Sequence, residues 1–282
     1  MTNYYCLVTG LPELSLEDGK LSYTVANFKT EIYPLLSKTD KKLVDLYYLK
    51  FDNHNLLSLL KDREAVVDAS LGNYSADELL GVIASFFKEK KVSDKKFPTY
   101  FYEFTELYLN TPDEERVDFE DKLYGFYYDY AIKCGNKFVS TWFELNLNVN
   151  NILAALTARK YKMEISKVPV GNNLIADALR TSDARDFGLA DELEYFDQLV
   201  RINDTVDLVE REKKIDMLKW FWLEENTFFN YFSIEKIFVF LMKLEMIERW
   251  VSLDKEKGNE MFRKLIDQLK DEVQIPQEFR NK

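Results

Sequence analysis

The sequence predicts an all-α protein, and two features of its composition and one of its patterning lead to this prediction. The 282 residues include only 9 glycines and 6 prolines, less than half the usual share of about 12% for these two residue types. Hydrophobic residues make up 46% of the chain, which is enough to build a sizeable core. Apolar residues recur at helical spacing along most of the chain. The scarcity of turn residues argues against a β-sandwich, a barrel or a glycine-rich nucleotide fold.

Two local motifs predict where helices begin. Ser75-Ala76-Asp77-Glu78 has the form of a capping box, in which two side chains satisfy free backbone N–H groups. Thr111-Pro112-Asp113-Glu114 adds a proline and acidic residues at the positive end of a helix. The aromatic helix predicted after it has one apolar face, formed by Phe119, Leu123, Phe126, Tyr127 and Tyr130.

Periodicity predicts the remaining elements. The first ten residues are expected to be extended, and breaks are expected near 90–97, 168–171 and 224–232. Further helices are expected over 22–36, 41–60, 98–109, 140–163, 172–179, 183–202, 205–223, 233–253 and 255–273. Because no long flexible linker separates these segments, we expect residues 1–282 to form a single compact unit.

Charge and composition exclude several classes of protein. The formal net charge is −11, which disfavours a partner such as duplex DNA or another nucleic acid. No stretch is apolar enough to span a membrane, so direct membrane insertion is not expected. Two cysteines and the absence of a signal peptide favour a reduced, cytoplasmic location.

Few motifs carry catalytic chemistry. His54 is the only histidine, which excludes histidine triads and multi-histidine metal sites; we expect it to be structural or solvated. Cys6 and Cys134 have no CxxC partner, and no phosphate-binding glycine loop is present. The sequence therefore predicts no catalytic residue, no metal site and no cofactor.

One acidic group leaves an alternative open. Asp118, Glu120 and Asp121 lie near the start of the aromatic-rich helix, and carboxylates three residues apart on a helix can bind Mg²⁺ and a diphosphate. Asp183 and Asp186 would supply a second cluster. This pattern is compatible with a Mg²⁺-dependent, all-α enzyme of the prenyl-transfer type, or simply with a solvated acidic face.

A repeated segment is the most informative pattern in the chain. Residues 51–63 and 147–159 align with an offset that makes Asn55/Asn151, Leu57/Leu153, Leu60/Leu156 and Arg63/Arg159 identical. A fainter third copy at 232–244 keeps the apolar positions but has Lys236 in place of asparagine. The spacing favours three related helical lobes over a solenoid; chance similarity between amphipathic helices is the alternative.

The repeated segments resemble a known family. Residues 147–160 resemble a motif of the C-type rotor subunits of V-/A-type ATPases, whose eukaryotic members are called d subunits, and residues 232–249 are similar to that family's C-terminal end. The opening residues 4–16 resemble a bacterial family of uncharacterised proteins associated with V-type ATPases. Thr157 and Lys236 depart from the family pattern.

The resemblance implies a three-lobed, funnel-shaped, all-helical subunit without an active site. Such a subunit is a rotor adaptor that couples the central stalk to the membrane proteolipid ring, which transports protons or sodium ions. One copy would be present per complex, in the cytoplasm and peripheral to the inner membrane. A general helical protein–protein adaptor is the second expectation. The positions that match the family motif are Asn55, Leu57, Leu60, Asn151, Leu153, Leu156, Arg159 and Lys160.

Overall fold

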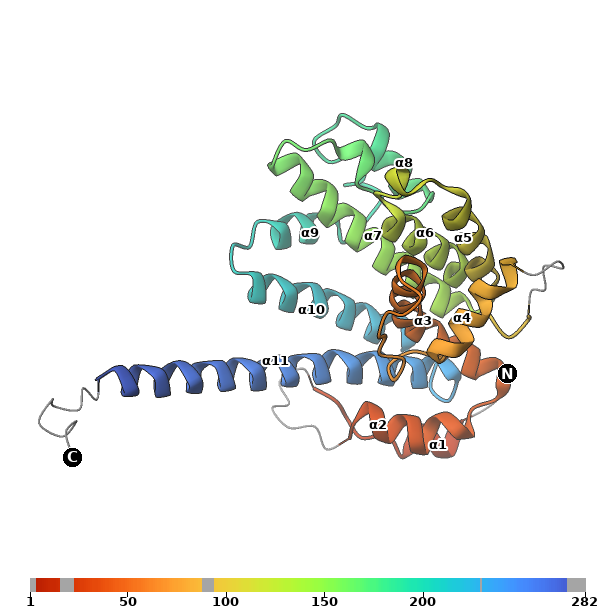
Figure 1. Cartoon of the computed structure of the whole chain (residues 1–282). Helices are drawn as coiled ribbons and strands as arrows, with labels where there is room; N and C mark the ends of the chain where they lie inside the picture. The colour runs from red at the N-terminus through yellow and green to blue at the C-terminus, as the bar shows by residue number, and fades with distance from the viewer. Residues whose placement is uncertain (1–3, 16–22, 88–93, 229, 273–282) are drawn as a thin grey trace, which may run out of the picture. The chain divides into compact units, whose positions relative to one another are not determined.

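The computed structural model describes residues 4–15, 23–87, 94–228 and 230–272 (Figure 1). Within these residues the chain forms eleven α-helices and no β-strand, which confirms the all-α prediction. The helices are α1 (Tyr5–Thr9), α2 (Val25–Asn27), α3 (Lys38–Lys61), α4 (Ala76–Ala84), α5 (Thr99–Asn110), α6 (Phe119–Ile132), α7 (Lys137–Lys160), α8 (Leu174–Thr181), α9 (Phe196–Asn203), α10 (Leu208–Thr227) and α11 (Ile234–Glu272). Over the described part of the chain, no helix combines the length and apolar character needed to cross a bilayer.

The chain divides into two compact units, where the sequence leads us to expect one. The first unit combines residues 1–36 with residues 223–282, and the second comprises residues 37–222. The border falls inside α10. Local periodicity does not reveal this division, because the first unit is assembled from the two ends of the chain.

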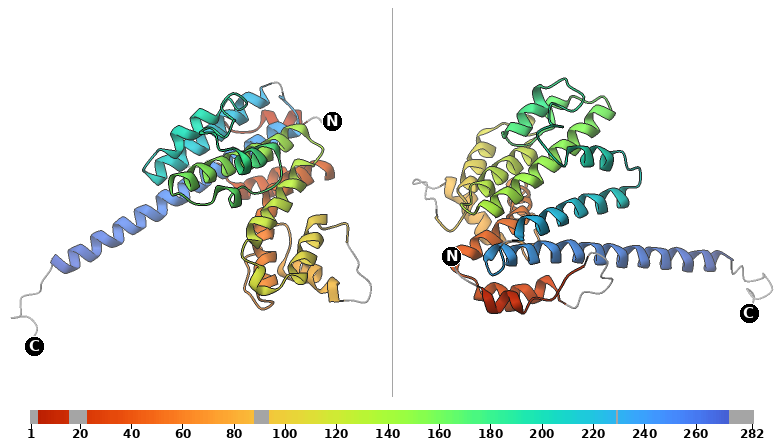
Figure 2. Two further views of the ribbon diagram at one scale, coloured as in Figure 1. Left: turned by 90° about the horizontal axis from the view of Figure 1, so that it is seen from above. Right: turned by 180° about the vertical axis from the view of Figure 1, so that it is seen from behind.

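The first unit is held together by contacts between its N-terminal helices and α11 (Figure 2). The backbone N–H of Tyr4 donates to the carbonyl of Phe232 at 2.8 Å, and the N–H of Val25 donates to the Glu248 carboxylate at 2.8 Å. The ring of Phe28 lies over that of Phe240, with centroids 6.5 Å apart. Side chains of Phe28, Ile237, Phe238, Leu241 and Leu244 are completely buried.

The second unit has an aromatic core. Helix α3 packs on α4 and α6, α6 packs on α7, and α7 packs on α8 and α9. Two buried tyrosines tie α3 to its neighbours: Tyr127 Oη donates to the carbonyl of Leu46 at 3.0 Å, and Tyr100 Oη donates to Asn53 Oδ1 at 2.6 Å. The aromatic face predicted for α6 is buried at Phe119, whereas Tyr130 is 37% exposed.

The two longest helices of this unit begin three residues earlier than their apolar patterns predict. Ser37 caps α3 by accepting the N–H of Asp40 at 3.2 Å. Asn136 caps α7 by accepting the N–H of Val139 at 3.0 Å. The first turn of α3, Lys38-Thr39-Asp40, is polar, so that periodicity alone places its start too late. The first turn of α7 contains Phe138 and Val139, and its true start is marked by the Asn136 cap rather than by a change in polarity. The capping box at Ser75 is confirmed.

The start predicted at Thr111-Pro112 is wrong for the aromatic helix. The residues after Pro112 form one 3₁₀ turn, Asp113–Glu115, and α6 begins only at Phe119. Arg116 explains the interruption, because its Nε donates to the carbonyl of Thr111 at 2.8 Å. Its guanidinium also lies over the ring of Tyr108 at 4.2 Å, which favours a closed turn over a continuing helix.

The helix predicted over 183–202 is also wrong in its first half, since α9 begins at Phe196. Phe187 and Gly188 have positive φ angles of 57° and 75°, which a right-handed helix does not allow. Asp186 Oδ1 accepts the N–H of Gly188 at 3.1 Å and stabilises this turn. Phe187 gains burial from it, with only 1% of its surface exposed.

Other boundaries also differ from the prediction. The opening residues are not extended, because Tyr5–Thr9 form α1. The break expected from residue 224 begins later, since α10 continues to Thr227. The two helices expected over 233–253 and 255–273 are a single helix, α11, because no proline separates them; residue 273 lies outside the described residues. The break at 168–171 is confirmed.

Candidate functional site

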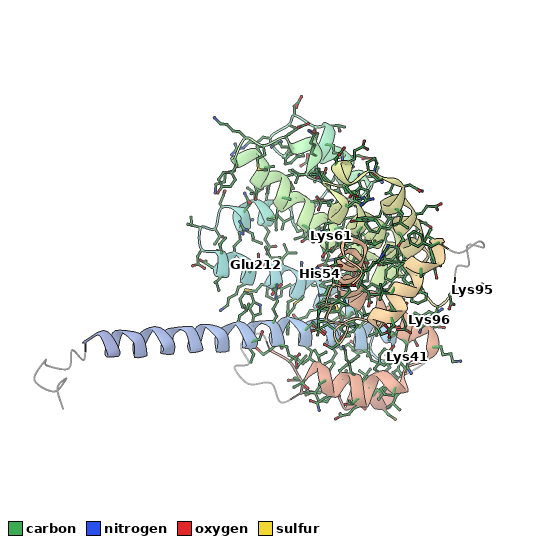
Figure 3. All side chains as sticks on the ribbon, in the orientation of Figure 1. Lys41, His54, Lys61, Lys95, Lys96 and Glu212 are labelled. Carbon is green, nitrogen blue, oxygen red and sulfur yellow. The ribbon has the colours of Figure 1, made fainter. Side chains whose placement is uncertain are left out.

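The repeated motif lies on α3 and α7, two helices of 24 residues each. Its central asparagines, Asn55 and Asn151, are 3% and 2% exposed, so both amides are buried. The neighbouring His54 is exposed on α3 (Figure 3), in agreement with a solvated role. These two central residues therefore lie in the interior of the second unit rather than in an open active site.

Each buried asparagine binds the backbone of the loop that follows its own helix. Asn55 Nδ2 donates to the carbonyl of Asp68 at 2.9 Å. Asn151 Nδ2 donates to the carbonyl of Val170 at 2.8 Å, and Asn151 Oδ1 accepts the N–H of the same residue at 2.8 Å. We call these contacts the asparagine latches; they fix the path of the chain between α3 and α4 and between α7 and α8.

A second pair of contacts, which the sequence did not lead us to expect, accompanies each latch. One turn before Asn55, Asp52 accepts the N–H of Asn73 at 2.9 Å and its Nδ2 at 2.9 Å. At the matching position, Asn148 Oδ1 accepts Nδ2 of Asn173 at 2.7 Å. The signal that could have revealed them is a glycine followed closely by asparagine just before each short helix.

Glycines permit the close approach of both loops. At Gly72, a Cβ atom would lie 2.3 Å from Asp52 Oδ1, so that any side chain would displace the carboxylate. Gly171 has a φ of +76°, a conformation that L-residues adopt only with strain. Burial raises the pKa of Asp52 to about 6, although its hydrogen bonds with Asn73 and Tyr74 act in the opposite direction.

The other motif positions have unequal environments in the two copies. Leu57 and Leu60 are buried, whereas Leu153 and Leu156 are half-buried. Arg63, two residues beyond the end of α3, donates back to the carbonyl of Leu59 at 3.2 Å.

Arg159 makes longer-range contacts than its counterpart in the first copy. It donates to the carbonyls of Ala184 and Arg185, and its guanidinium lies 3.7 Å from the centre of the Phe187 ring. Lys160 is exposed. Arg159 therefore fixes the irregular segment before α9, whereas Lys160 faces solvent.

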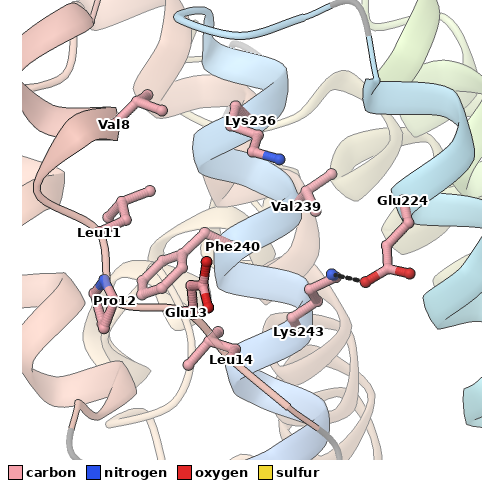
Figure 4. Close-up of a pocket in the computed structure, with 10 residues that line it drawn as sticks. All are labelled: Val8, Leu11, Pro12, Glu13, Leu14, Glu224, Lys236, Val239, Phe240 and Lys243. Carbon is pink, nitrogen blue, oxygen red and sulfur yellow. Dashed lines mark hydrogen bonds and ion pairs between the residues drawn. The ribbon is translucent and has the colours of Figure 1, made fainter.

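The third copy of the motif, in the first unit, does not form a latch. Lys236, at the asparagine position, lines a cavity of about 380 Å³ between residues 8–14 and α11 (Figure 4). In the same cavity Lys243 Nζ lies 2.7 Å from Glu224 Oε1, and burial lowers the pKa of Lys243. A latch reaches 13 or 19 residues ahead; from Lys236 that distance still lies within α11, where no loop exists to be held.

The acidic residues considered for Mg²⁺ binding are only partly brought together. Asp118 and Asp121 line a cavity of about 340 Å³, and its lining does not include Asp183 or Asp186. Burial and the charges of Asp118 and Glu120 raise the pKa of Asp121. Among the described residues, no group of three or more His, Cys, Asp or Glu side chains is placed to hold a metal ion.

The family of the chain follows from a match over almost its whole length. Residues 1–273 match the family described as "Protein of unknown function (DUF2764)". The chain belongs to the DUF2764 family. No curated protein and no solved structure matches it.

In this DUF2764 chain the repeated residues have structural roles that the geometry explains. The latch residues are buried and bonded to backbone, and a buried amide bonded in this way positions a loop rather than a reacting group. Groups able to meet another molecule must therefore be sought on exposed helix faces and in the cavities.

Proposed function

We propose that the chain is a non-catalytic rotor adaptor of a bacterial V-type ATPase. In this role it links the rotating central stalk to the proteolipid ring, whose ions are protons or sodium. The proposal includes one copy per complex and a cytoplasmic position, peripheral to the inner membrane. It extends the resemblance of residues 147–160 and 232–249 to the C-type rotor subunits of V-/A-type ATPases, with the three-lobed funnel as its finer prediction.

The paired asparagine latches are the observation that supports this proposal most. The motif that resembles one in those rotor subunits recurs in α3 and α7, and in both copies its asparagine donates to a carbonyl of the loop ahead. Two identical residues with equivalent contacts are not expected from chance similarity between amphipathic helices. Loops that are fixed by a buried side chain also suit an adaptor that transmits torque, because they limit the movement of one helix relative to the next.

An exposed apolar pair on α10 offers a contact surface. Met217 and Phe221 are 43% and 51% exposed, and residues four positions apart lie on the same helix face. One turn earlier, Lys214 and Glu210 form an ion pair at 2.8 Å. Apolar side chains bordered by charges are typical of protein–protein contact sites, so we propose that this pair meets a stalk or ring subunit.

Co-expression of the tagged chain with the stalk and proteolipid subunits of its own source tests the proposal. We expect a stable assembly that contains the chain in one copy, measured by native mass spectrometry. Met217→Asp together with Phe221→Asp should weaken the association at least about tenfold, because the interface would have to bury two unpaired charges.

Val66→Asp is the matched control, since Val66 is fully exposed in the loop after α3. This variant should associate as the parent chain does. A chain that elutes alone, while the other subunits assemble without it, would contradict the proposal and favour a helical adaptor for other partners. Equal association of the α10 variant and the control would contradict only the assignment of the surface.

A further inference from the structure

The second unit contains a cavity of about 460 Å³ that the latches do not use. It lies between α3, the segment 95–98 that leads into α5, and the end of α6; Figure 3 labels Lys95 and Lys96 on that segment. Cavities of about 300 to 1,000 Å³ are typical of small-molecule sites. The size of this cavity is therefore suited to a small organic ligand.

The wall of this cavity is apolar and aromatic. Leu43, Leu46 and Leu49 contribute to it from successive positions along α3, and all three are buried. The lining also includes Tyr74 and Phe97, whose ring centroids are 4.9 Å apart. Tyr74 Oη donates to the carbonyl of Lys96 at 3.0 Å and so fixes the ring. A planar aromatic group would find both aliphatic and ring surfaces here.

The charged side chains around the same cavity are almost all cationic. Its lining includes four lysines and one acid, Asp45, in a chain of net charge −11. Lys96 pairs with Glu78. The lysines at 42, 95 and 133 form no ion pair with any described residue. Three exposed lysines at the rim of one cavity, against the single acid Asp45, favour an anionic ligand.

We propose that this cavity binds a small aromatic anion of the aryl monophosphate class. The ring lies between the leucines of α3 and the Tyr74–Phe97 pair, and the phosphate lies among Lys42, Lys95 and Lys133. A free phosphate would pair with the lysines but leave the apolar wall in contact with water. A neutral aromatic ring would cover the apolar wall but leave the lysines without an anion. This inference is independent of the adaptor role and of the subunits that the chain binds.

Cys134 provides a direct probe, because its half-buried thiol lines the cavity. In the full-length chain with Cys6→Ser, the rate of Cys134 alkylation by iodoacetamide is measured by intact mass. Phenyl phosphate should slow alkylation, and calorimetry should show it to bind at least about tenfold more tightly than inorganic phosphate or benzyl alcohol. Raising the salt concentration should weaken binding by screening the lysines.

Charge reversal at the lysines tests the assignment. Lys95→Glu together with Lys133→Glu should weaken phenyl phosphate binding at least about tenfold, and the milder pair Lys95→Gln and Lys133→Gln should weaken it less. Lys137→Glu, an exposed residue outside the lining, should leave binding unchanged.

Three results would overturn the inference. Phenyl phosphate at about 10 mM could fail to slow the alkylation of Cys134. Inorganic phosphate could bind as tightly as phenyl phosphate does. Finally, the double glutamate variant could keep the affinity of the parent chain for phenyl phosphate while its circular dichroism spectrum is unchanged.

Discussion

At the residue scale, the latch asparagines supply hydrogen bonds that the loop backbone cannot find elsewhere. A buried peptide group needs partners for both its N–H and its carbonyl. The asparagine side chain carries one acceptor and two donors, and Asn151 uses both kinds on Val170. Asn55 uses only its donor, on Asp68. An aspartate at either position would be unable to donate to the loop carbonyl.

Removal of a latch should therefore destabilise the second unit. We expect Asn151→Ala to cost about 2 to 3 kcal/mol of unfolding free energy and Asn55→Ala about 1 to 2, because the first loses two bonds and the second one. Urea unfolding measures both. The control is Asn150→Ala: Asn150 is exposed and makes one long bond, 3.4 Å, to Tyr128 Oη. If Asn150→Ala lowered the unfolding free energy as much as Asn151→Ala does, the stabilising role of the latch would be contradicted.

Asp52 gives the stability of the chain a dependence on pH. Its pKa is raised by burial from 3.8 to about 6, so the folded state binds a proton more tightly than the unfolded state does. The stabilising contribution of this proton is complete below a pH of about 4 and is lost as the pH rises through about 6, with a magnitude of up to about 3 kcal/mol.

Asp52→Asn should remove this dependence, because an amide stays neutral at every pH. The matching position of the second copy is already an asparagine, Asn148. Between pH 4.5 and 7, we expect the unfolding free energy of the variant to gain about 2 kcal/mol relative to the parent. Asp191→Asn, at an exposed carboxylate, controls for the loss of one charge. If the unfolding free energies of Asp52→Asn and the parent changed with pH in parallel, Asp52 would not be the source of the pH dependence.

At the element scale, helices with a strong apolar face were predictable, whereas their ends depended on single polar contacts. The capping box at Ser75 was predicted correctly because both of its residues lie at the start of the helix that they cap, Ser75 directly before α4 and Glu78 in its first turn. The false start at Pro112 looked equally good, and the contacts of Arg116 with the Thr111 carbonyl and the Tyr108 ring explain why the turn closes there. The turn at Phe187 could have been suspected from Gly188 alone.

Glycines provide a test of the loops that lead into the short helices. Gly171→Ala should cost about 1 to 2 kcal/mol, because alanine is strained at a positive φ and its Cβ would lie 3.3 Å from Leu147 Cδ2. Gly81→Ala should instead stabilise the chain by about 0.5 to 1 kcal/mol, since it lies inside α4 with open space around it. Thermal unfolding of both variants measures whether the two stability changes have opposite signs. Two changes of the same sign would contradict the roles given to these glycines.

The candidate sites show the same limit of sequence reasoning. The two latch asparagines were found because the repeat preserves their spacing within a helix. Their accompanying residues, Asn73 and Asn173, lie beyond loops of different length, so an ungapped comparison cannot align them. The lysines around the 460 Å³ cavity come from α3, from the entry to α5 and from the end of α6, and only folding brings these segments together.

At the scale of the whole molecule, the two units differ in how their contacts are distributed along the chain. The second unit is continuous in sequence, from residue 37 to residue 222, whereas the first needs both chain ends. Contacts such as that between Tyr4 and Phe232 close a very long loop. No local pattern encodes such a closure, which is why the sequence led us to expect one unit.

Because its core is internal, the second unit should fold alone. A fragment of residues 37–227, which retains the end of α10, should unfold cooperatively and show a helical circular dichroism spectrum. In this fragment Asn151→Ala should cost the same free energy as in the full chain, to within about 0.5 kcal/mol. A fragment without a cooperative transition would show that the second unit depends on the chain ends.

The latches also allow the two loops to differ in length. The first spans 13 residues from asparagine to bonded carbonyl, and the second spans 19, yet both loops deliver the chain to a capped short helix. The extra closure entropy of six residues is only about 0.3 kcal/mol. Insertions between residues 62 and 67 should accordingly be absorbed without displacing α4, so this loop is a natural place for an epitope or a fluorescent label, and one where related chains are free to diverge in length.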